Sequence, residues 1–197
     1  MLTRFPDKPH EMSKSKLDDL DHEGGWIATS KGDGWRCMLI NQDGCQAWSR
    51  HNKRLDDLND FNPDIMESFR ALETPPGTIL DTEWIRRRTK AKGNFCMLIG
   101  ILRWGDKWLH RLKEKERFDR LLELKIDGQA LRQPRHRWHS FGSFFRLLES
   151  TDKIIYEGIV LKHQNSRLIL NTKESKKNPL WVKIKWRGGA DGQRETL

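Results

Sequence analysis

The residue of this chain with the clearest potential for chemistry is a lysine. Lys31 opens the segment KGDGWR at residues 31–36, in which a potential nucleophile precedes a glycine-containing turn and an arginine. A lysine amine attacks phosphorus only as the neutral base, so burial or nearby cations must disfavour its protonated form. Lys183 and Lys185 occupy alternate positions of a predicted strand, so they point to one face and could supply those cations. Taken alone, the segment fits a lysine in a hairpin turn equally well.

Four more segments follow Lys31 in a fixed order: SR at residues 49–50, LDTEW at 80–84, EGIVLK at 157–162 and WVKIK at 181–185. Together the five segments resemble the motifs of the covalent nucleotidyltransferase superfamily, which contains ATP-dependent DNA ligases, RNA ligases and messenger-RNA capping enzymes. Within it, the chain looks like the adenylation domain of an ATP-dependent DNA ligase. The resemblance implies an α+β fold of antiparallel sheets with flanking helices, the ligase-type, ATP-grasp-like nucleotidyltransferase domain. It also implies a lysyl-AMP intermediate on Lys31.

In that family the motif residues hold the nucleotide, and the resemblance carries their roles to positions of this chain. Arg36 would contact the nucleotide sugar, and Glu83 would accept hydrogen bonds from the ribose hydroxyls. Glu157, with Glu83, would place Mg²⁺, which bridges phosphate oxygens while keeping most of its water. ATP and Mg²⁺ are thus the implied cofactors, and the three lysines above are the implied catalytic residues. The implied ATP and AMP contacts are Thr29, Ser30, Lys31, Arg36, Arg50, Glu83, Ile99, Lys162, Lys183 and Lys185.

Two of these assignments have simpler alternatives. Arg36 fits an exposed cation on a strand as well as a nucleotide ligand. Glu83 could instead form a cross-strand ion pair with Arg86, Arg87 or Arg88.

Ser49 and Arg50 bear on the nucleic-acid substrate. In DNA ligases an SR pair after the first motif reaches strand phosphates and the nucleotide, and EGIVLK also favours that branch. The predicted activity is sealing of nicked duplex DNA. Two departures leave the choice of base open: Thr29 stands where DNA ligases carry a glutamate that reads adenine, and Ile99 stands where an aromatic ring stacks. The alternatives are an RNA ligase, an enzyme that activates RNA ends, and a non-catalytic nucleic-acid-binding module on the same fold.

The composition suits such a partner. The 197 residues carry 37 Lys and Arg against 28 Asp and Glu, a net charge of +9. This favours a polyanion, because neutralised phosphates release counterions, although a merely soluble basic protein has it too. No apolar run approaches the ~20 residues of a membrane span. Cys37, Cys45 and Cys96 lack C-x-x-C spacing. We therefore expect a cytoplasmic monomer without membrane contact. The resemblance to DNA ligases implies a role in DNA repair or replication.

The chain divides into three parts by its composition. Residues 1–23 predict a polar, loosely attached lead-in with one short helix at 13–20. Residues 24–186 would form the nucleotidyltransferase domain, and 187–197 a short polar tail. Nearly all relatives follow the last motif with an OB-fold domain, for which too few residues remain after Lys185. We expect this domain to be missing and its function to come, if at all, from a separate protein.

Apolar periodicity predicts the elements that position these residues. Arg117 lies in a helical segment that resembles one in ligases, although a solvated helix face is the simpler interpretation of its charges. The basic run 132–139, with Trp138 inside it, could grip a phosphate backbone or form a solvated loop. Helices are predicted at residues 62–73, 114–125 and 141–148, and strands at 26–30, 35–41, 45–49, 78–85, 95–102, 154–162, 167–171 and 180–186.

Overall fold

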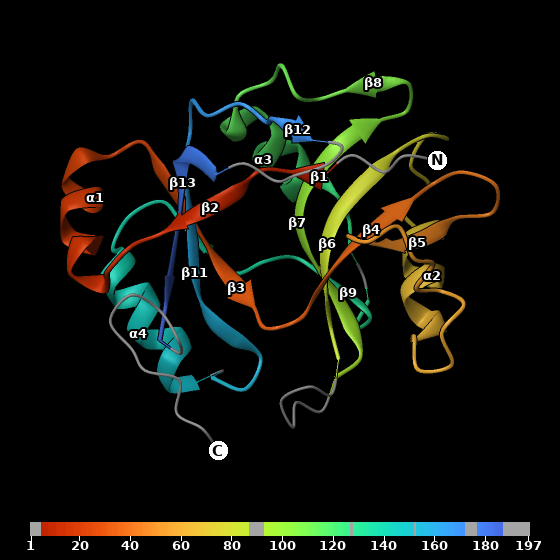
Figure 1. Ribbon diagram of the computed structural model, residues 1–197, viewed down its shortest axis with the longest axis horizontal. Helices are drawn as coiled ribbons and strands as arrows, with labels where there is room; N and C mark the ends of the chain where they lie inside the picture. The colour runs from red at the N-terminus through yellow and green to blue at the C-terminus, as the bar shows by residue number, and fades with distance from the viewer. Residues whose placement is uncertain (1–4, 87–92, 127, 152, 172–176, 187–197) are drawn as a thin grey trace.

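Two sheets stand side by side in the computed structural model, which describes residues 5–86, 93–126, 128–151, 153–171 and 177–186 (Figure 1). One sheet has the strand order β10-β3-β11-β13-β2 and the other β5-β4-β6-β7-β8, with β9 also paired to β7. The first comprises β10 (His136–Arg137), β3 (Trp26–Gly32), β11 (Tyr156–His163), β13 (Lys177–Lys185) and β2 (Lys8–Glu11). The second comprises β5 (Gln46–Ser49), β4 (Trp35–Ile40), β6 (Ile79–Ile85), β7 (Phe95–Trp104), β8 (Lys107–Trp108) and β9 (Leu131–Arg132).

Helices cover these sheets, and a short ladder joins β1 (Phe5–Pro6) to β12 (Leu170–Asn171). The helices are α1 (Leu17–Glu23), α2 (Pro63–Arg70), α3 (Glu114–Glu123) and α4 (Phe141–Thr151), with a 3₁₀ turn η1 (Lys14–Lys16) before α1. Most pairings are antiparallel, but β2 runs parallel to β13 and β9 parallel to β7. The predicted α+β class is confirmed, with mixed rather than purely antiparallel sheets. None of the helices among the described residues is long and apolar enough to cross a bilayer.

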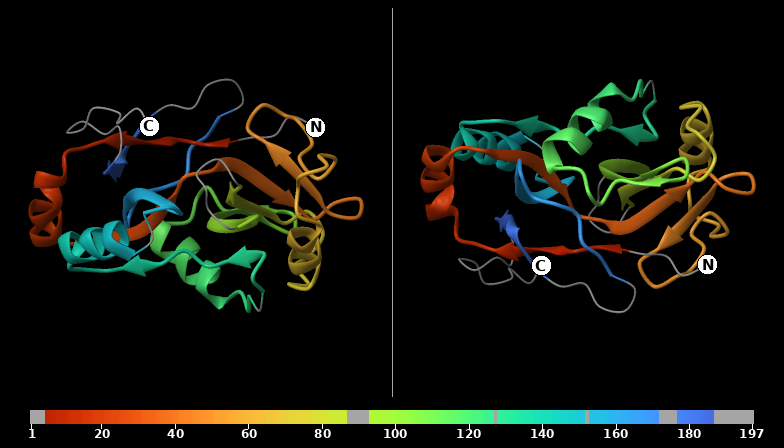
Figure 2. Two further views of the ribbon diagram at one scale, coloured as in Figure 1. Left: turned by 90° about the horizontal axis from the view of Figure 1, so that it is seen from below. Right: turned by 90° about the horizontal axis from the view of Figure 1, so that it is seen from above.

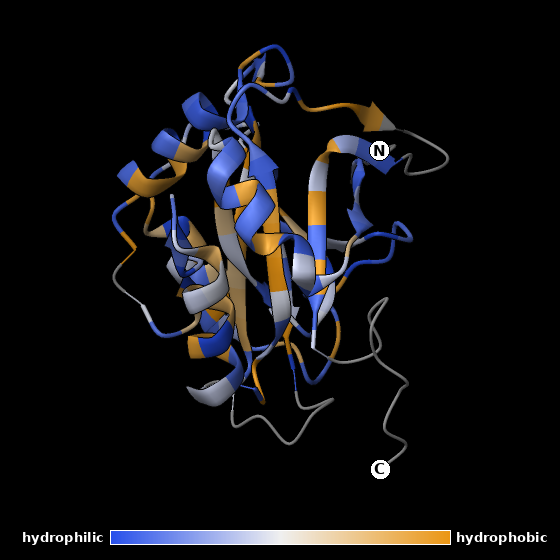
Figure 3. Cartoon of the chain, turned by 90° about the vertical axis from the view of Figure 1, so that its left-hand side faces the viewer, coloured by the Kyte–Doolittle hydropathy of each residue, from blue (hydrophilic) through white to orange (hydrophobic). Residues whose placement is uncertain are grey.

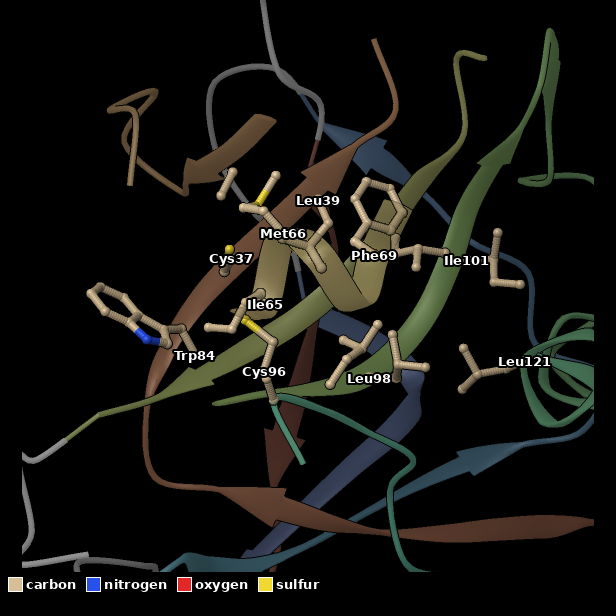
Figure 4. Close-up of a cluster of buried hydrophobic side chains, with 14 of the residues drawn as sticks. Cys37, Leu39, Ile65, Met66, Phe69, Trp84, Cys96, Leu98, Ile101 and Leu121 are labelled. Atoms are coloured by element: carbon tan, nitrogen blue, oxygen red, sulfur yellow. The ribbon is translucent and has the colours of Figure 1, made fainter. Parts of the chain in front are cut away.

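Each sheet has its own apolar core. Ile65, Met66 and Phe69 of α2 point at strand residues such as Leu39 and Leu98 of the second sheet (Figure 4). The helix begins as its sequence predicts, with the Asn62 side chain accepting a hydrogen bond from the Asp64 N–H at 3.0 Å and proline at the first helical position. The first sheet packs on α1 and α4, which lie together at the left of Figure 1.

Along β11 and β13, successive side chains point alternately to the apolar core and to the face that carries the predicted lysines. Ile159 and Ile184 enter the core beneath α4, so Val160, Lys183 and Lys185 point to the opposite face. The same division of apolar and polar residues appears as orange and blue along the helices and strands in Figure 3. The period of two thus brings the predicted lysines to one surface.

The segment around Lys31 is not a hairpin turn. Lys31 lies inside β3, which pairs with β10 and β11, whereas β4 pairs with β5 and β6. The chain therefore crosses from one sheet to the other at Asp33 and Gly34. A Cβ on Gly34 would overlap the Trp84 carbonyl oxygen and lie 2.9 Å from its carbon. The glycine is needed where the crossing passes β6.

The N-terminal segment is more closely integrated than its polar sequence predicts. Strand β2, in red in Figure 2, forms an edge of the first sheet. Glu11 on this strand is in register with Lys183. Helix α1 buries Leu17 and Leu20 against α4, and Asp21 accepts a hydrogen bond from the Phe141 N–H at 2.7 Å. The described residues from 5 onward therefore belong to the body of the domain, because their apolar partners lie near the other end of the chain.

A β-bulge at Glu157 shifts the register of β11, the central strand of the first sheet. Tyr156 is opposite Gly32 and Gly158 is opposite Lys31, so Glu157 is the extra residue on β11. Bulges next to functional sites commonly redirect a side chain. A Cβ on Gly158 would overlap the Ile184 carbonyl oxygen and lie 2.8 Å from the Cα of Lys185. Only glycine allows β13 to pack this closely against the bulge.

Gly158→Ala should therefore destabilise the fold by about 1–3 kcal/mol, as overpacking typically does. Gly100→Ala is the matched control, because a Cβ at Gly100 meets no heavy atom within 4 Å. Its change should stay within about 0.5 kcal/mol. Urea unfolding of the two variants measures both values. Equal changes would show that the contact with β13 does not require glycine.

Candidate nucleotidyltransferase site

The carboxylate of Glu157 joins two of the three predicted lysines. Lys31 Nζ donates to its Oε1, and Lys185 Nζ donates to its Oε2 at 2.9 Å. The three residues come from adjacent strands in the order β3-β11-β13, and Gly158 is in register with both lysines. The bulge thus places one carboxylate between two ammonium groups.

The third lysine meets a carboxylate from the N-terminal strand. Lys183 Nζ lies 3.0 Å from Glu11 Oε2, as the register of β2 with β13 requires. Lys31, Lys183 and Lys185 all line one groove, so the structure brings together the three residues predicted to be catalytic. Sequence reasoning missed Glu11, because only the pairing of β2 with β13 places it there.

Glu83 and Arg36 lie on neighbouring strands at the same groove and are in register. Arg36 makes a bidentate ion pair with Asp81, which the sequence interpretation quoted in its motif but gave no role. Arg86 pairs with Asp60. Arg87 and Arg88 lie outside the described residues, so the alternative of an ion pair between them and Glu83 is not tested.

The two site carboxylates have opposite electrostatic character. Burial alone would raise the pKa of Glu157, but the charge and hydrogen bond of Lys31 and the hydrogen bond of Lys185 hold it below the ordinary 4.5. Burial raises the pKa of Glu83, and the nearby charges of Lys31 and Arg36 only partly oppose this. The negative charges of Asp81 and Glu157 raise it further. Glu157 is therefore matched by cations, and Glu83 is short of positive charge.

These two carboxylates fit a divalent cation. Mg²⁺ usually binds proteins through one or two carboxylates and completes its shell with water and substrate phosphates. Glu83 and Glu157 interact as like charges at the groove, a repulsion that a divalent cation between them would relieve. The donor set is therefore suitable for the predicted metal, with Glu157 and Glu83 as the residues that would hold it.

A narrow pocket of about 80 Å³ opens from the groove beside Lys31. Ile99 of β7 and Val160 of β11 are among its walls, and Thr29 and Ser30 line it from β3. Thr29 Oγ1 donates to the Val160 carbonyl at 3.3 Å, and Ser30 Oγ accepts from the Arg135 N–H at 3.2 Å. The two hydroxyl groups thus connect β3 to β11 and to the segment before β10. The aliphatic side chains of Ile99 and Val160 line a slot of the kind that a flat ring can enter.

Lys162 lies at the same pocket and belongs to a buried ionic triad. Its Nζ donates to Glu114 Oε1 at 3.0 Å and to the Ile99 carbonyl at 3.4 Å, and the Trp181 ring centroid is 4.6 Å away. Glu114 also pairs with Arg117, which is only 3% exposed. The interpretation of Arg117 as part of a solvated helix face was therefore wrong. Helix α3 instead fixes a cation at the pocket.

The other predicted nucleic-acid contacts differ in their roles. Ser49 Oγ accepts from the backbone N–H groups of His51 and Lys53 at 3.3 and 3.1 Å, so it shapes the turn after β5. That turn carries the exposed Arg50 into the groove lining. The basic run 132–139 contributes β10, which pairs with β3 at Thr29, and none of the described groove lining.

Glu157→Gln should destabilise the protein by about 1.5–3 kcal/mol at pH 7, the usual value of hydrogen bonds to a charged group. Because the pKa of Glu157 is lowered, this contribution is present above the ordinary 4.5 and disappears as pH falls through the folded pKa. Glu83→Gln should show the opposite sign, because a raised pKa makes ionisation cost stability as pH increases. Urea unfolding between pH 3 and 8 measures both, and parallel curves for the two variants would contradict this assignment.

The comparison with known proteins rests on structure alone, since no family model and no curated protein matches the chain. A mycobacterial DNA ligase D complexed with ATP and MES superposes with a TM-score of 0.65 at 15% identity, over 92% of this chain and 60% of that one. A structure from a study of Lig E DNA ligases superposes with a TM-score of 0.55 at 14% identity, over 90% of this chain and 68% of that one. A Naegleria gruberi RNA ligase with ATP and Mn superposes with a TM-score of 0.53 at 16% identity, over 94% of this chain and 58% of that one.

The chain thus spans about 60% of the length of that ligase D. DNA and RNA ligases superpose on nearly all of it, and the resemblance found in its five motifs agrees with them. The chain has the fold of the nucleotidyltransferase domain of ATP-dependent DNA and RNA ligases.

Proposed function

We propose that this protein is an ATP-dependent polynucleotide ligase that forms lysyl-AMP on Lys31. The observation that carries the proposal is the Glu157 carboxylate shared by Lys31 and Lys185, together with the slot beside Lys31 that Ile99 and Val160 line. Such an arrangement offers a nucleophile, a phosphate-binding cation and a place for a base within one groove. The ligase fold supports it.

The first step transfers AMP to the protein. Lys31 Nζ attacks the α-phosphorus of ATP, a P–N bond forms, the bond to pyrophosphate breaks and the amine loses a proton. Before it attacks, Nζ must leave the Glu157 carboxylate. Mg²⁺ held by Glu157 and Glu83 would supply positive charge to the phosphate oxygens. Lys183 and Lys185 would stabilise the charge that develops there, which in such sites is commonly worth several kcal/mol.

The next steps pass AMP to nucleic acid. A 5′-phosphate oxygen attacks the lysyl-AMP phosphorus, the P–N bond breaks and Lys31 is released. The 3′-hydroxyl of the adjoining strand then attacks the 5′-phosphorus, a phosphodiester forms and AMP leaves. Arg50, with the turn after β5, would bind strand phosphates at the groove. We propose nicked duplex DNA as the substrate, because the SR pair and the EGIVLK segment resemble those of DNA ligases.

RNA is the second candidate substrate. RNA ligases are among the similar structures, with TM-scores of 0.53 and 0.54, close to the 0.55 of the Lig E structure. Thr29 stands in place of the glutamate expected of DNA ligases. Sealing of matched nicked DNA and nicked RNA, each with a labelled 5′-phosphate, separates the two. Faster joining of RNA would replace the first candidate by the second.

Lys31→Ala should abolish modification by ATP. Intact-mass measurement of the wild type with ATP and Mg²⁺ should show one added AMP, and the variant should show none. Lys31→Arg should also fail, because guanidinium stays protonated at any usable pH.

Lys115→Arg is the control for a lysine substitution, because Lys115 pairs with Asp119 on α3, outside the groove lining. It should be adenylated like the wild type. A wild-type protein that gains no AMP between neutral and alkaline pH would reject the enzyme and leave the non-catalytic binding module.

A further inference from the structure

The groove continues well past the slot beside Ile99. Its volume is about 1040 Å³, against about 80 Å³ for the slot. Pockets for a whole small molecule range from roughly 300 to 1,000 Å³. From Lys31 the groove extends over β4 to Leu58 and Arg86. It therefore has room for a polymer beside the nucleotide.

Two exposed apolar side chains mark this extension. Of the eight large hydrophobic side chains that are exposed in the described part of the chain, only Trp35 and Leu58 line the groove. They are 40% and 39% exposed. Trp35 directly follows Gly34 at the crossing between the sheets, four positions after Lys31 in the chain.

The Trp35 ring is held in place from the core outward. The fully buried Trp84 meets it edge-on, with 6.0 Å between ring centroids and an interplanar angle of 83°. Trp84 is fixed by Phe61 at 4.9 Å and by a 2.6 Å hydrogen bond from its Nε1 to Asn94. Arg86, which pairs with Asp60, places its guanidinium carbon 4.8 Å from the Trp35 centroid. The ring is thus a rigid, partly exposed surface, which needs no ordering to bind a ligand.

The groove lining is also rich in basic side chains. Lys8, Arg50, Lys53 and Lys183 are among them. Burial lowers the pKa of Lys8, and the charges of Arg50, Lys183 and Arg36 lower it further. Positive charge is therefore concentrated where it repels itself, and a polyanion would relieve that repulsion.

A flat aromatic platform in a groove with a basic lining matches a single-stranded nucleic acid, whose bases stack on rings while its phosphates meet cations. Bases inside an intact duplex already stack on each other, so a fixed ring can take a base only where pairing is broken. We propose that Trp35, backed by Arg86, is a stacking site for an unpaired base of the bound strand, with the phosphates of that strand on Arg50 and Lys53. The inference rests on nucleic acid being the substrate of the proposed function. It requires that the bound end exposes at least one unpaired nucleotide, and a nicked duplex would meet this requirement only where the end frays.

Fluorescence anisotropy without ATP tests the site by binding alone. The probes are a labelled, 5′-phosphorylated single strand of about 12 nucleotides and the same strand in a blunt duplex. Trp35→Ala should weaken binding of the single strand by about 5- to 100-fold, the usual effect of losing one stacked base, and binding of the duplex by less than about twofold. Trp35→Phe should lie between the wild type and Trp35→Ala.

Trp138→Ala is the matched control, because Trp138 is 36% exposed but is not among the groove-lining residues. It should change neither affinity. Unchanged binding of the single strand by Trp35→Ala, an equal loss for strand and duplex, or no measurable binding of the single strand by the wild type would each overturn the inference. If urea unfolding shows that Trp35→Ala does not fold, the same binding comparison is made with Trp35→Phe. This variant should lose more affinity for the single strand than for the duplex, and an equal loss would overturn the inference.

Adenylation of the wild-type protein, measured on the same preparation, separates the two proposals. Normal lysyl-AMP formation with unchanged strand binding by Trp35→Ala rejects the stacking site alone. Absence of lysyl-AMP together with the expected loss of strand binding rejects the enzyme and leaves Trp35 as a nucleic-acid contact.

Discussion

The shared carboxylate of Glu157 is the interaction around which the site is built. Removing a charge from water costs several kcal/mol, so a half-buried carboxylate persists only when charged partners surround it. Here two ammonium groups do so, and their effect on the pKa of Glu157 outweighs that of burial. The bulge that displaces Glu157 and the glycine that lets β13 approach it both serve this contact. The sheet is therefore arranged for one carboxylate between two lysines.

This arrangement explains how a nucleotide could be handled without large movement of the backbone. The lysines already line one groove, where phosphate oxygens could replace the carboxylates as partners of their ammonium groups. Glu83, whose pKa burial and nearby negative charge raise, lacks such compensation until positive charge arrives. Preorganised charge of this kind stabilises a transition state without further cost of reorganisation. Helix α3 adds Lys162 to the pocket through Glu114 and Arg117.

Local patterns predicted much of this fold and site, and contacts between distant segments explain what they missed. Asn62 and the following proline predicted the start of α2, and alternation on β13 predicted that Lys183 and Lys185 share a face. The burial of Arg117 was missed because the cation that shares Glu114 with it, Lys162, lies 48 positions from Glu114. The crossing at Asp33 was not predicted, because no local pattern shows that β3 and β4 belong to different sheets. The role of Glu11 was not predicted either, because it depends on the pairing of β2 with β13. The assignment of residues to nucleotide binding stays a prediction.

A crystal structure with α,β-methylene ATP and Mn²⁺ would test the central claim most directly. The account predicts the base between Ile99 and Val160 and anomalous scattering from Mn²⁺ at Glu157 and Glu83. It also predicts Lys31 Nζ released from Glu157 and about 3–3.5 Å from the α-phosphorus, the separation of reacting atoms in a near-attack geometry. A nucleotide bound elsewhere, with the slot empty and Lys31 still on Glu157, would contradict it.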